Sequence, residues 1–385
     1  MTATARVQSP RAEIEGAMVR WARDLAGWSV DDAAHVLGVS ADRWRAWESG
    51  TSSPTMSQLR ALADRIDQPV GVFFLPEPPR APAPAVAFRR VSAAGAVSPA
   101  LAMDVRRAIR HREIALDLLP DGGDVVATSS PLLSLRLRAG QDVASAGTEL
   151  RDALGVSVTE QLQAPASHAL GLWRRAVERA GVLVFETRSA TVHDARGICI
   201  DERPLPLVVL NGKDAVTARA FTLLHECVHL ALGEGAVCDG DDREIERFCD
   251  RVAAAALLPT ESIRAEARRV RRDPTTQWSD AELRKLANRF GASAQATLLR
   301  LVALGLATQD EHDRRRASFR ARRATSKDGA PPPHMLSLKY CGRLYPRIVL
   351  DALSRDAVTY TSAARYLGLS AKHLPQLERE LVRHP

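Results

Sequence analysis

Phe221 to Leu232, with the sequence F-T-L-L-H-E-C-V-H-L-A-L, is the stretch around which this chain is organised, and it contains the pattern H-E-x-x-H. On a helix, His225 and His229 project from one face, where two imidazoles can bind one metal ion. Glu226 lies one position further round, where its carboxylate can take a proton from a water held at the metal. The apolar flanking residues predict a helix buried in a domain core. The alternative is a core helix whose two histidines are only hydrogen-bonded.

A second segment supplies candidates for a third ligand, because a hydrolytic zinc site uses three protein ligands and leaves one position for water. Arg243 to Pro259 reads R-E-I-E-R-F-C-D-R-V-A-A-A-A-L-L-P, an alanine-rich run typical of a helix that a proline ends. Glu246 and Asp250 are spaced i, i+4 and share one face of that helix. On this reasoning either carboxylate can complete the site.

The two segments together resemble a known family. The run from Trp173 to Pro259 is similar to the ImmA/IrrE zinc metallopeptidases, whose pattern is F-T-x-x-H-E-x-x-H followed by E-x-x-[AC]-N-x-F-A-A-x-x-L-x-P. The resemblance implies that His225, His229 and Glu246 bind Zn²⁺ and that Glu226 is the catalytic general base. It therefore implies a zinc metalloendopeptidase.

The chain departs from the family pattern at two positions of the second segment. Asp250 stands where the family usually has Asn, and Val252 stands where it has Phe. The first departure adds a negative charge near the metal. We interpret Asp250 as a partner that orients a ligand histidine from behind.

Short β-branched runs precede the H-E-x-x-H stretch. Gly181–Glu186, Ile198–Asp201 and Leu207–Leu210 are bounded by turn residues, which indicates strands. We expect a small sheet packed against the helix that carries the two histidines, in a mixed α/β zincin-like peptidase domain over residues 171–307. A sheet edge beside the metal can hold an extended peptide by strand addition.

The N-terminal part of the chain carries a different motif. Val30 to Leu37, a turn at Gly38 to Ser40, and Ala41 to Glu48 read as two short helices joined by a tight turn. Residues 15–75 resemble the Cro/repressor-type (XRE) helix-turn-helix domain, which is all-α. The resemblance makes the second helix of the pair the recognition helix. The side chains best placed to contact DNA are then Ser40, Asp42, Arg43 and Arg45.

Helical periodicity extends beyond the two motifs. A helix is predicted from Ile14, with one buried face made of Met18, Trp21, Leu25 and Trp28. Residues 76–90 are a proline-rich linker, which we expect to be extended and stiff. Residues 91–170 read as a mostly helical region.

The net charge of +7 is concentrated in the C-terminal third. Residues 1–80 carry 9 Lys and Arg against 10 Asp and Glu, whereas residues 261–385 carry 24 against 13. Lys and Arg supply most of the affinity for DNA. The slight excess of acidic residues in residues 1–80 therefore favours the alternative that the N-terminal domain binds a protein partner. A homodimer doubles the few cations of a recognition helix, so we expect operator DNA and a homodimer. The run Arg314 to Lys327, in a basic linker over residues 308–333, reads as a phosphate-binding block or a solvated linker.

The last region, residues 334–385, is predicted to be helical and basic, and it repeats part of the N-terminal motif. Ala363 to Ser370 reads A-A-R-Y-L-G-L-S and Ala33 to Ser40 reads A-A-H-V-L-G-V-S, with five of eight positions identical. A second helix-turn-helix is one interpretation. The other is a chance recurrence, because the segment is short and Pro375 limits where the next helix can run.

Composition narrows the class of protein. The hydrophobic content of 45% and charged content of 26% are those of an ordinary globular protein. Met1 to Pro10 is polar with no apolar segment behind it, so we expect no signal peptide. No apolar run approaches the roughly 20 residues that span a bilayer. The five cysteines are odd in number and lack framework spacing, which predicts reduced thiols in the cytoplasm.

The predicted architecture is an α+β multidomain protein. An all-α helix-turn-helix domain comes first, the mixed α/β peptidase domain follows, and a helical basic region ends the chain. The predicted function is a cytoplasmic DNA-binding regulator whose zinc endopeptidase cleaves a partner regulatory protein, such as a helix-turn-helix repressor; the substrate class is implied by the family resemblance. The alternative is an antitoxin-like, non-catalytic regulator that neutralises a neighbouring nuclease toxin and represses its own operon. An intact H-E-x-x-H favours the first, and a purely structural zinc would leave Glu226 without a role.

Overall fold

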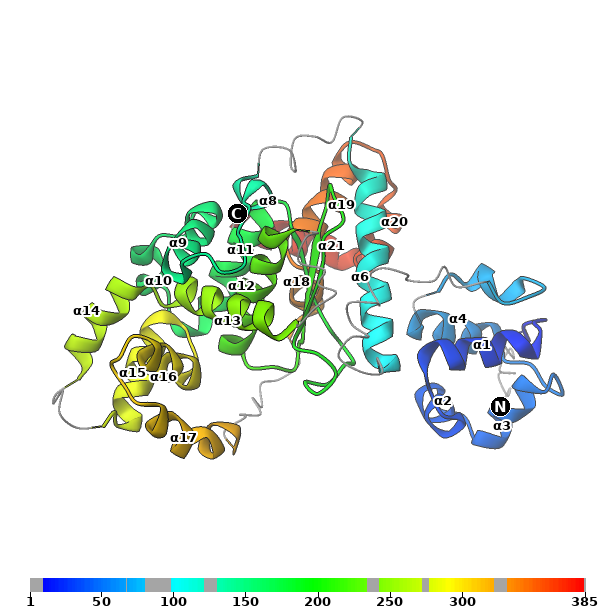
Figure 1. The fold of residues 1–385 in the computed structure, drawn as a ribbon. Coiled ribbons are helices and arrows are strands. Elements are labelled where there is room, and N and C mark those ends of the chain that lie inside the picture. The colour runs from blue at the N-terminus through cyan, green and yellow to red at the C-terminus, as the bar shows by residue number, and fades with distance from the viewer. Residues whose placement is uncertain are drawn as a thin grey trace, which may run out of the picture. The chain divides into compact units, whose positions relative to one another are not determined.

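The computed structural model describes residues 10–66, 68–79, 98–120, 130–233, 242–271, 277–321 and 331–383. The chain forms two compact units, which divide in sequence between Arg107 and Ala108, inside helix α6 (Pro99–Leu118). Figure 1 shows the helices and strands of both units.

Four short helices and one 3₁₀ turn make up most of the first unit. They are α1 (Gly16–Ala26), α2 (Val30–Leu37), α3 (Ala41–Glu48), α4 (Met56–Arg65) and η1 (Val70–Phe74). Local sequence explains their ends: the side chains of Ser29, Ser40 and Thr55 each accept a backbone N–H at the start of a helix. Gly38 ends α2 with φ 64°, a conformation that glycine adopts without strain. The tight turn predicted between α2 and α3 is therefore present.

The core of this unit is built on Trp44 and Trp47 of α3, which are fully buried. The expected buried face of α1 differs in detail from the prediction. Its buried residues are Met18, Val19, Ala22 and Ala26. Trp21, Leu25 and Trp28 are only partly buried and pack at the margin of the core, where Trp21 meets Phe73 edge to face at 6.0 Å. Trp21, Leu25 and Trp28 therefore cover the margin of the core and do not fill its centre.

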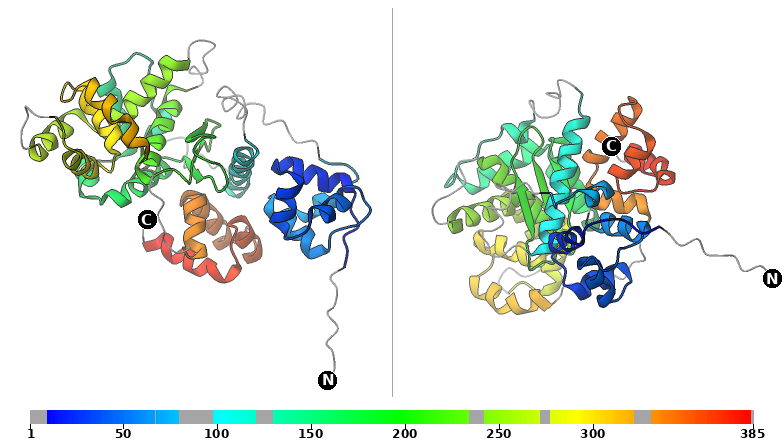
Figure 2. Two further views of the ribbon diagram at one scale, coloured as in Figure 1. Left: turned by 90° about the horizontal axis from the view of Figure 1, so that it is seen from below. Right: turned by 90° about the vertical axis from the view of Figure 1, so that its right-hand side faces the viewer.

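The second unit is mostly helical and contains one small sheet. Its helices, after the second half of α6, are α8 (Pro131–Ser134), α9 (Val143–Leu154), α10 (Val158–Gln163), η2 (Ala166–His168), α11 (Ala169–Arg179), α12 (Val216–Leu232), α13 (Asp242–Leu257), α14 (Thr260–Val270), α15 (Asp280–Phe290), α16 (Ala294–Ala303), α17 (Gln309–Ala321), α18 (Pro333–Cys341), α19 (Leu344–Ser354), α20 (Tyr360–Tyr366), η4 (Ala371–His373) and α21 (Leu374–Arg383). Figure 2 shows the last four helices, coloured orange to red, gathered in one group.

The sheet has three strands in the order β1-β3-β2. These are β1 (Leu183–Glu186), β2 (Gly197–Ile200) and β3 (Leu207–Leu210), with β3 parallel to β1 and antiparallel to β2. α12 packs against β2 and β3, and α11 packs against α12 and β1. The predicted small sheet against the histidine-bearing helix is confirmed, with strand ends that differ from the predicted ones by at most two residues.

One hydrophobic cluster joins α8 and α9 to α11, α12, α13 and α16. Within this cluster α9 and α13 approach each other closely, because a Cβ on Gly147 would lie 2.7 Å from Ala255 Cβ and 2.9 Å from its carbonyl carbon. A glycine at this position lets the two helices touch. The helix that carries Glu246 and Asp250 is therefore fixed by a segment about a hundred residues earlier in the sequence.

The C-terminal helices pack on strand β1 through a buried carboxylate. Glu178 of α11 is 5% exposed, and its Oε1 accepts the backbone N–H of Arg343 at 2.7 Å, just before α19 begins. Arg174, one turn earlier, donates to the carbonyl of Lys339 at 2.8 Å and to that of Val184 at 2.7 Å. These bonds fix α18 and α19 beside the sheet, so the C-terminal helices belong to the second compact unit.

Several predicted segments lie wholly or partly outside the described residues. They include most of the proline-rich linker (76–90), the start of the helical region (91–170) and residues 322–327 of the basic run. No helix in the described part of the chain is long and apolar enough to span a membrane. The cysteines at 199, 227, 249 and 341 are buried. The domain boundaries given above remain predictions.

Candidate metal centre and nucleic-acid interface

Three predicted ligands meet where α12 crosses α13. His225 Nε2 and His229 Nε2 lie 3.0 Å apart, as expected for imidazoles four residues apart on one helix. The carboxylate of Glu246 on α13 reaches both: Oε2 lies 3.3 Å from His225 Nε2, and Oε1 lies 3.3 Å from His229 Nε2. Among the described residues these three form a group whose ligand atoms all lie within 4.8 Å of one another.

This spacing fits a tetrahedral zinc ion. With zinc–nitrogen and zinc–oxygen bonds of about 2.0–2.1 Å, neighbouring ligand atoms of a tetrahedron lie about 3.3 Å apart. The observed separations of 3.0, 3.3 and 3.3 Å lie close to that edge, with the two Glu246 distances measured to different oxygens of its carboxylate. Two neutral imidazoles and one carboxylate are also a ligand set that catalytic zinc sites use, with the fourth position left for water.

The two carboxylates of α13, which the spacing alone left as alternatives, occupy different positions. Glu246 faces the Nε2 atoms of both histidines, whereas Asp250 Oδ1 lies 3.0 Å from His225 Nδ1 on the far side of the ring. On His229 the corresponding atom, Nδ1, lies 3.8 Å from Cys249 Sγ. A hydrogen bond to Nδ1 leaves Nε2 of the same ring available to a metal and fixes the ring plane.

Glu226 lies beside these groups but is enclosed. Its side chain is buried, and the residue is 8% exposed. Gly197, the first residue of β2, lies directly against it, because a Cβ there would be 2.5 Å from Glu226 Oε1 and would also overlap Thr222. The strand therefore holds the carboxylate on one side while α12 holds it on the other.

The four candidate DNA-contacting residues of the helix-turn-helix differ in their local contacts. Arg43 and Arg45 are exposed on α3, but Arg45 is paired with Asp42, Nη1 to Oδ1 at 2.8 Å. Ser40 Oγ accepts the backbone N–H of Arg43 at 3.3 Å and so caps the helix. Arg43 is therefore the predicted cation that has no carboxylate partner among the described residues.

Comparison with known families accounts for both regions. Residues 16–70 match the family model described as a helix-turn-helix domain, and residues 177–302 match the peptidase M78 model described as an IrrE N-terminal-like domain. The chain joins a helix-turn-helix domain to an IrrE-like peptidase-family domain. This confirms both family resemblances and the predicted fold class. No curated protein matches the chain.

Electrostatics in the IrrE-like domain favour a positive charge between the two histidines. Burial lowers the pKa of His225, but hydrogen bonds to Asp250 and Glu246 outweigh it and raise that pKa to about 10. Bonds to His225 and His229 in turn hold the pKa of Glu246 well below its usual range. The positive charge that these carboxylates stabilise can be supplied by a proton or by a metal cation. Burial raises the pKa of Glu226.

Two residues beside the candidate centre were not predicted to act there. Gly197 gives no signal in the sequence, because a glycine at a strand start has many uses and its contact with Glu226 is tertiary. Cys249 is predicted from the sequence only as a reduced thiol, because its position behind His229 follows from the packing of α13 on α12. Burial raises the pKa values of the Cys227 and Cys249 thiols, which fits small buried groups better than redox sensors.

Proposed function

We propose that this protein is a DNA-binding regulator whose IrrE-like domain is a zinc-dependent endopeptidase. The observation that carries the proposal is the meeting of His225, His229 and Glu246, whose ligand atoms all lie within 4.8 Å of one another, next to the buried carboxylate of Glu226. When bound, zinc polarises a substrate carbonyl and lowers the pKa of water toward about 7.

Each residue of the centre has its own task in this proposal. His225, His229 and Glu246 hold the metal, and Asp250 and Cys249 orient the two imidazoles from behind. Glu226 accepts the proton of the attacking water and passes it to the leaving amine. Gly197 keeps the space in which the Glu226 carboxylate lies.

The proposed substrate is a protein rather than a small molecule. β2 pairs with β3 on one side and packs on α12, so it is the strand of the described sheet that lies nearest to the helix with the histidines. An extended segment of a partner protein can lie along such an edge by strand addition. We propose a regulatory protein, such as a helix-turn-helix repressor, as the partner, and we place the reaction in the cytoplasm.

The N-terminal helix-turn-helix is proposed to bind operator DNA as a homodimer. Arg43 is the residue with most to contribute, because Asp42 already neutralises Arg45. Residues 1–80 carry no net positive charge, which makes the dimer important, since two copies double the number of phosphate contacts.

The test compares wild type with Glu226→Gln, which keeps the shape of the side chain but removes the base. Each protein encoded beside its gene is offered as substrate, and intact substrate is followed over time. We expect the variant to lose about 10²-fold to 10⁴-fold in cleavage rate while it keeps its zinc. Glu261→Gln, on the exposed start of α14, is the matched control and should cleave like wild type.

One result would replace this account. If wild type and Glu226→Gln both hold zinc, neither cuts a neighbour, and both bind and silence a neighbouring nuclease, the domain is a recognition scaffold. The antitoxin-like function would then stand in place of the peptidase.

A further inference from the structure

The turn between α20 and η4 has the same backbone structure as the turn between α2 and α3. In the N-terminal turn, Gly38 N–H donates to the carbonyl of His35 at 3.1 Å, and Val39 N–H donates to that of Ala34 at 2.9 Å. In the C-terminal turn the corresponding bonds, from Gly368 to Arg365 and from Leu369 to Ala364, have the same lengths of 3.1 and 2.9 Å. The two glycines have φ 64° and 61°.

The correspondence continues beyond the repeated octapeptide. The fourth and seventh residues after Ser40 are Trp44 and Trp47, and both are fully buried. The fourth and seventh residues after Ser370 are Leu374 and Leu377, which are 2% and 0% exposed. If the octapeptide recurred by chance, the burial of the fourth and seventh residues after it would not be expected to agree. Helix α20, the turn and the η4–α21 helix therefore form a second helix-turn-helix, with η4–α21 in the position of the recognition helix.

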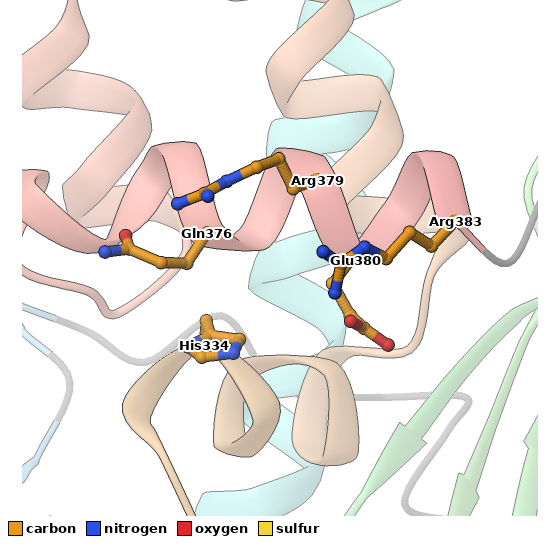
Figure 3. A pocket seen from close by; sticks show the side chains of 5 residues that line it. All are labelled: His334, Gln376, Arg379, Glu380 and Arg383. Atoms are coloured by element: carbon orange, nitrogen blue, oxygen red, sulfur yellow. The ribbon is translucent and has the colours of Figure 1, made fainter.

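The exposed face of this second helix is basic. Lys372, Gln376, Arg379 and Arg383 follow one another at spacings of four, three and four residues. Lys372 lies on η4, and at 3.6 residues per turn the other three fall within an arc of about 60° on α21, opposite the buried leucines of that helix. We call these four residues the α21 stripe. Figure 3 shows three of them, with Glu380, around a pocket that His334 of α18 also lines.

The balance of charge favours a polyanion as partner. Residues 331–383 carry eight Lys and Arg against four Asp and Glu, whereas the N-terminal 80 residues are slightly acidic. Glu378 and Glu380 also lie on α21, with Arg379 between them and Arg383 three positions after Glu380. The described ion pairs include none that joins a stripe cation to a carboxylate, while Arg45 in the N-terminal domain is paired with Asp42.

We propose that η4–α21 binds duplex DNA. Lys372, Arg379 and Arg383 contact phosphates, and His373 and Gln376, near the start of the helix, face base edges, as the first residues of a recognition helix do. DNA fits better than double-stranded RNA, because the deep and narrow major groove of RNA does not admit a helix. This proposal does not depend on zinc chemistry. It gives the chain a second DNA contact, carried by the basic region that the peptidase does not use.

The experiment uses the full chain and a labelled duplex of mixed sequence, about 20 base pairs or two turns long. The stripe variant is Lys372→Gln with Arg379→Gln and Arg383→Gln. The matched control, Arg138→Gln with Arg268→Gln and Lys285→Gln, removes the same charge from three exposed cations on other elements. Affinity is measured by fluorescence anisotropy between about 50 and 200 mM salt.

We expect the stripe variant to bind about tenfold more weakly or worse near 150 mM salt, with a salt dependence reduced by about 2 to 3 in log–log slope. The control should follow wild type. Equal losses in both variants, or wild-type binding by the stripe variant, would overturn the proposal. So would stronger competition by single-stranded RNA or anionic vesicles than by unlabelled duplex.

A measurement on wild type alone guards against a stripe variant that fails to fold. Amide hydrogen exchange of residues 371–383 should slow when the duplex is added. Exchange that slows in α3 and stays unchanged in α21 would assign DNA binding to the N-terminal domain alone and would refute a second contact.

Discussion

Gly197 shows how one residue shapes the candidate site. Because a Cβ there would lie 2.5 Å from Glu226 Oε1, Gly197→Ala should push the carboxylate aside without touching a metal ligand. A displacement of about 1 Å can cost roughly 10²-fold in rate, so cleavage should fall by that order while zinc content stays the same. Gly71→Ala, where a Cβ would meet nothing within 4 Å, is the control. Unchanged cleavage by Gly197→Ala would mean that Glu226 is not held from the strand side.

Asp250 acts on the metal only through His225 in this account. Asp250→Ala removes the bond to His225 Nδ1, and such losses cost about 10-fold to 100-fold in metal affinity or activity. Asp250→Asn keeps an oxygen that accepts the ring N–H and should recover most of the affinity. Zinc titration against a competing chelator measures both variants. Equal affinity in Asp250→Ala and wild type would remove Asp250 from the centre.

Glu48 gives the helix-turn-helix domain an acid sensitivity. Burial raises the pKa of this carboxyl, but bonds from Arg23 at 2.6 Å and Trp44 at 2.7 Å outweigh it, and the pKa lies below its usual 4.5. A depressed pKa in the folded state adds stability that is present above the unfolded pKa and is lost as pH falls through the folded one.

The pH dependence therefore has a definite sign. Acidification below about pH 4.5 should destabilise this domain, and Glu48→Gln should lower its stability at neutral pH by roughly 1–3 kcal/mol and flatten its acid response. Tryptophan fluorescence during thermal unfolding reports the change, because Trp44 and Trp47 are in this core. The exposed Glu13→Gln is the control. An acid response that survives in Glu48→Gln would assign it to another group.

At the scale of elements, the approach of α9 to α13 positions Glu246 and Asp250. Gly147→Ala should destabilise the second unit by roughly 1–3 kcal/mol, because the added Cβ meets the backbone of Ala255 and Ala256. Gly171→Ala on α11 is the matched control, since its Cβ would meet only the far end of the Arg175 side chain. That change should be neutral or stabilise by up to about 1 kcal/mol. Thermal unfolding that ranks the two variants the other way would contradict the packing described here.

Elements with strong local signals could be predicted from the sequence. The ends of α2, α3 and β3 agree with the predicted residues, because caps, glycine turns and β-branched runs are local features. The spacing of His225 and His229 on one helix also predicts that their imidazoles meet, and the structure brings the two Nε2 atoms to 3.0 Å. The features that could not be predicted depend on tertiary packing. Whether Glu246 or Asp250 faces the Nε2 atoms depends on how α13 is turned against α12, and the α9 contact at Gly147 joins residues about a hundred positions apart.

Two of the predicted DNA-contacting residues also make local contacts. The Ser40 hydroxyl caps α3, and Arg45 forms an exposed ion pair with Asp42, so their contacts with DNA stay predictions. Both contacts form within one turn of helix, where polar side chains satisfy the nearest backbone or charge.

At the scale of the whole molecule, the chain combines sites that rest on different elements. Zinc ligands are proposed on α12 and α13, and DNA contacts are proposed on α3 and α21. The second helix-turn-helix is fixed to the sheet of the IrrE-like domain through Glu178 and Arg174. DNA held by α21 would thus bring the proposed peptidase to the same DNA, where the proposed repressor substrates would be bound.

The central claim is that one zinc ion is held by His225, His229 and Glu246 beside a base that is not a ligand. The most direct measurement is zinc bound per folded chain in wild type, Glu246→Ala, Glu244→Ala and Glu226→Gln. We expect about one zinc in wild type, in the exposed neighbour variant Glu244→Ala and in Glu226→Gln, and far less in Glu246→Ala. Wild type without zinc, or Glu246→Ala that retains it fully, would contradict the account.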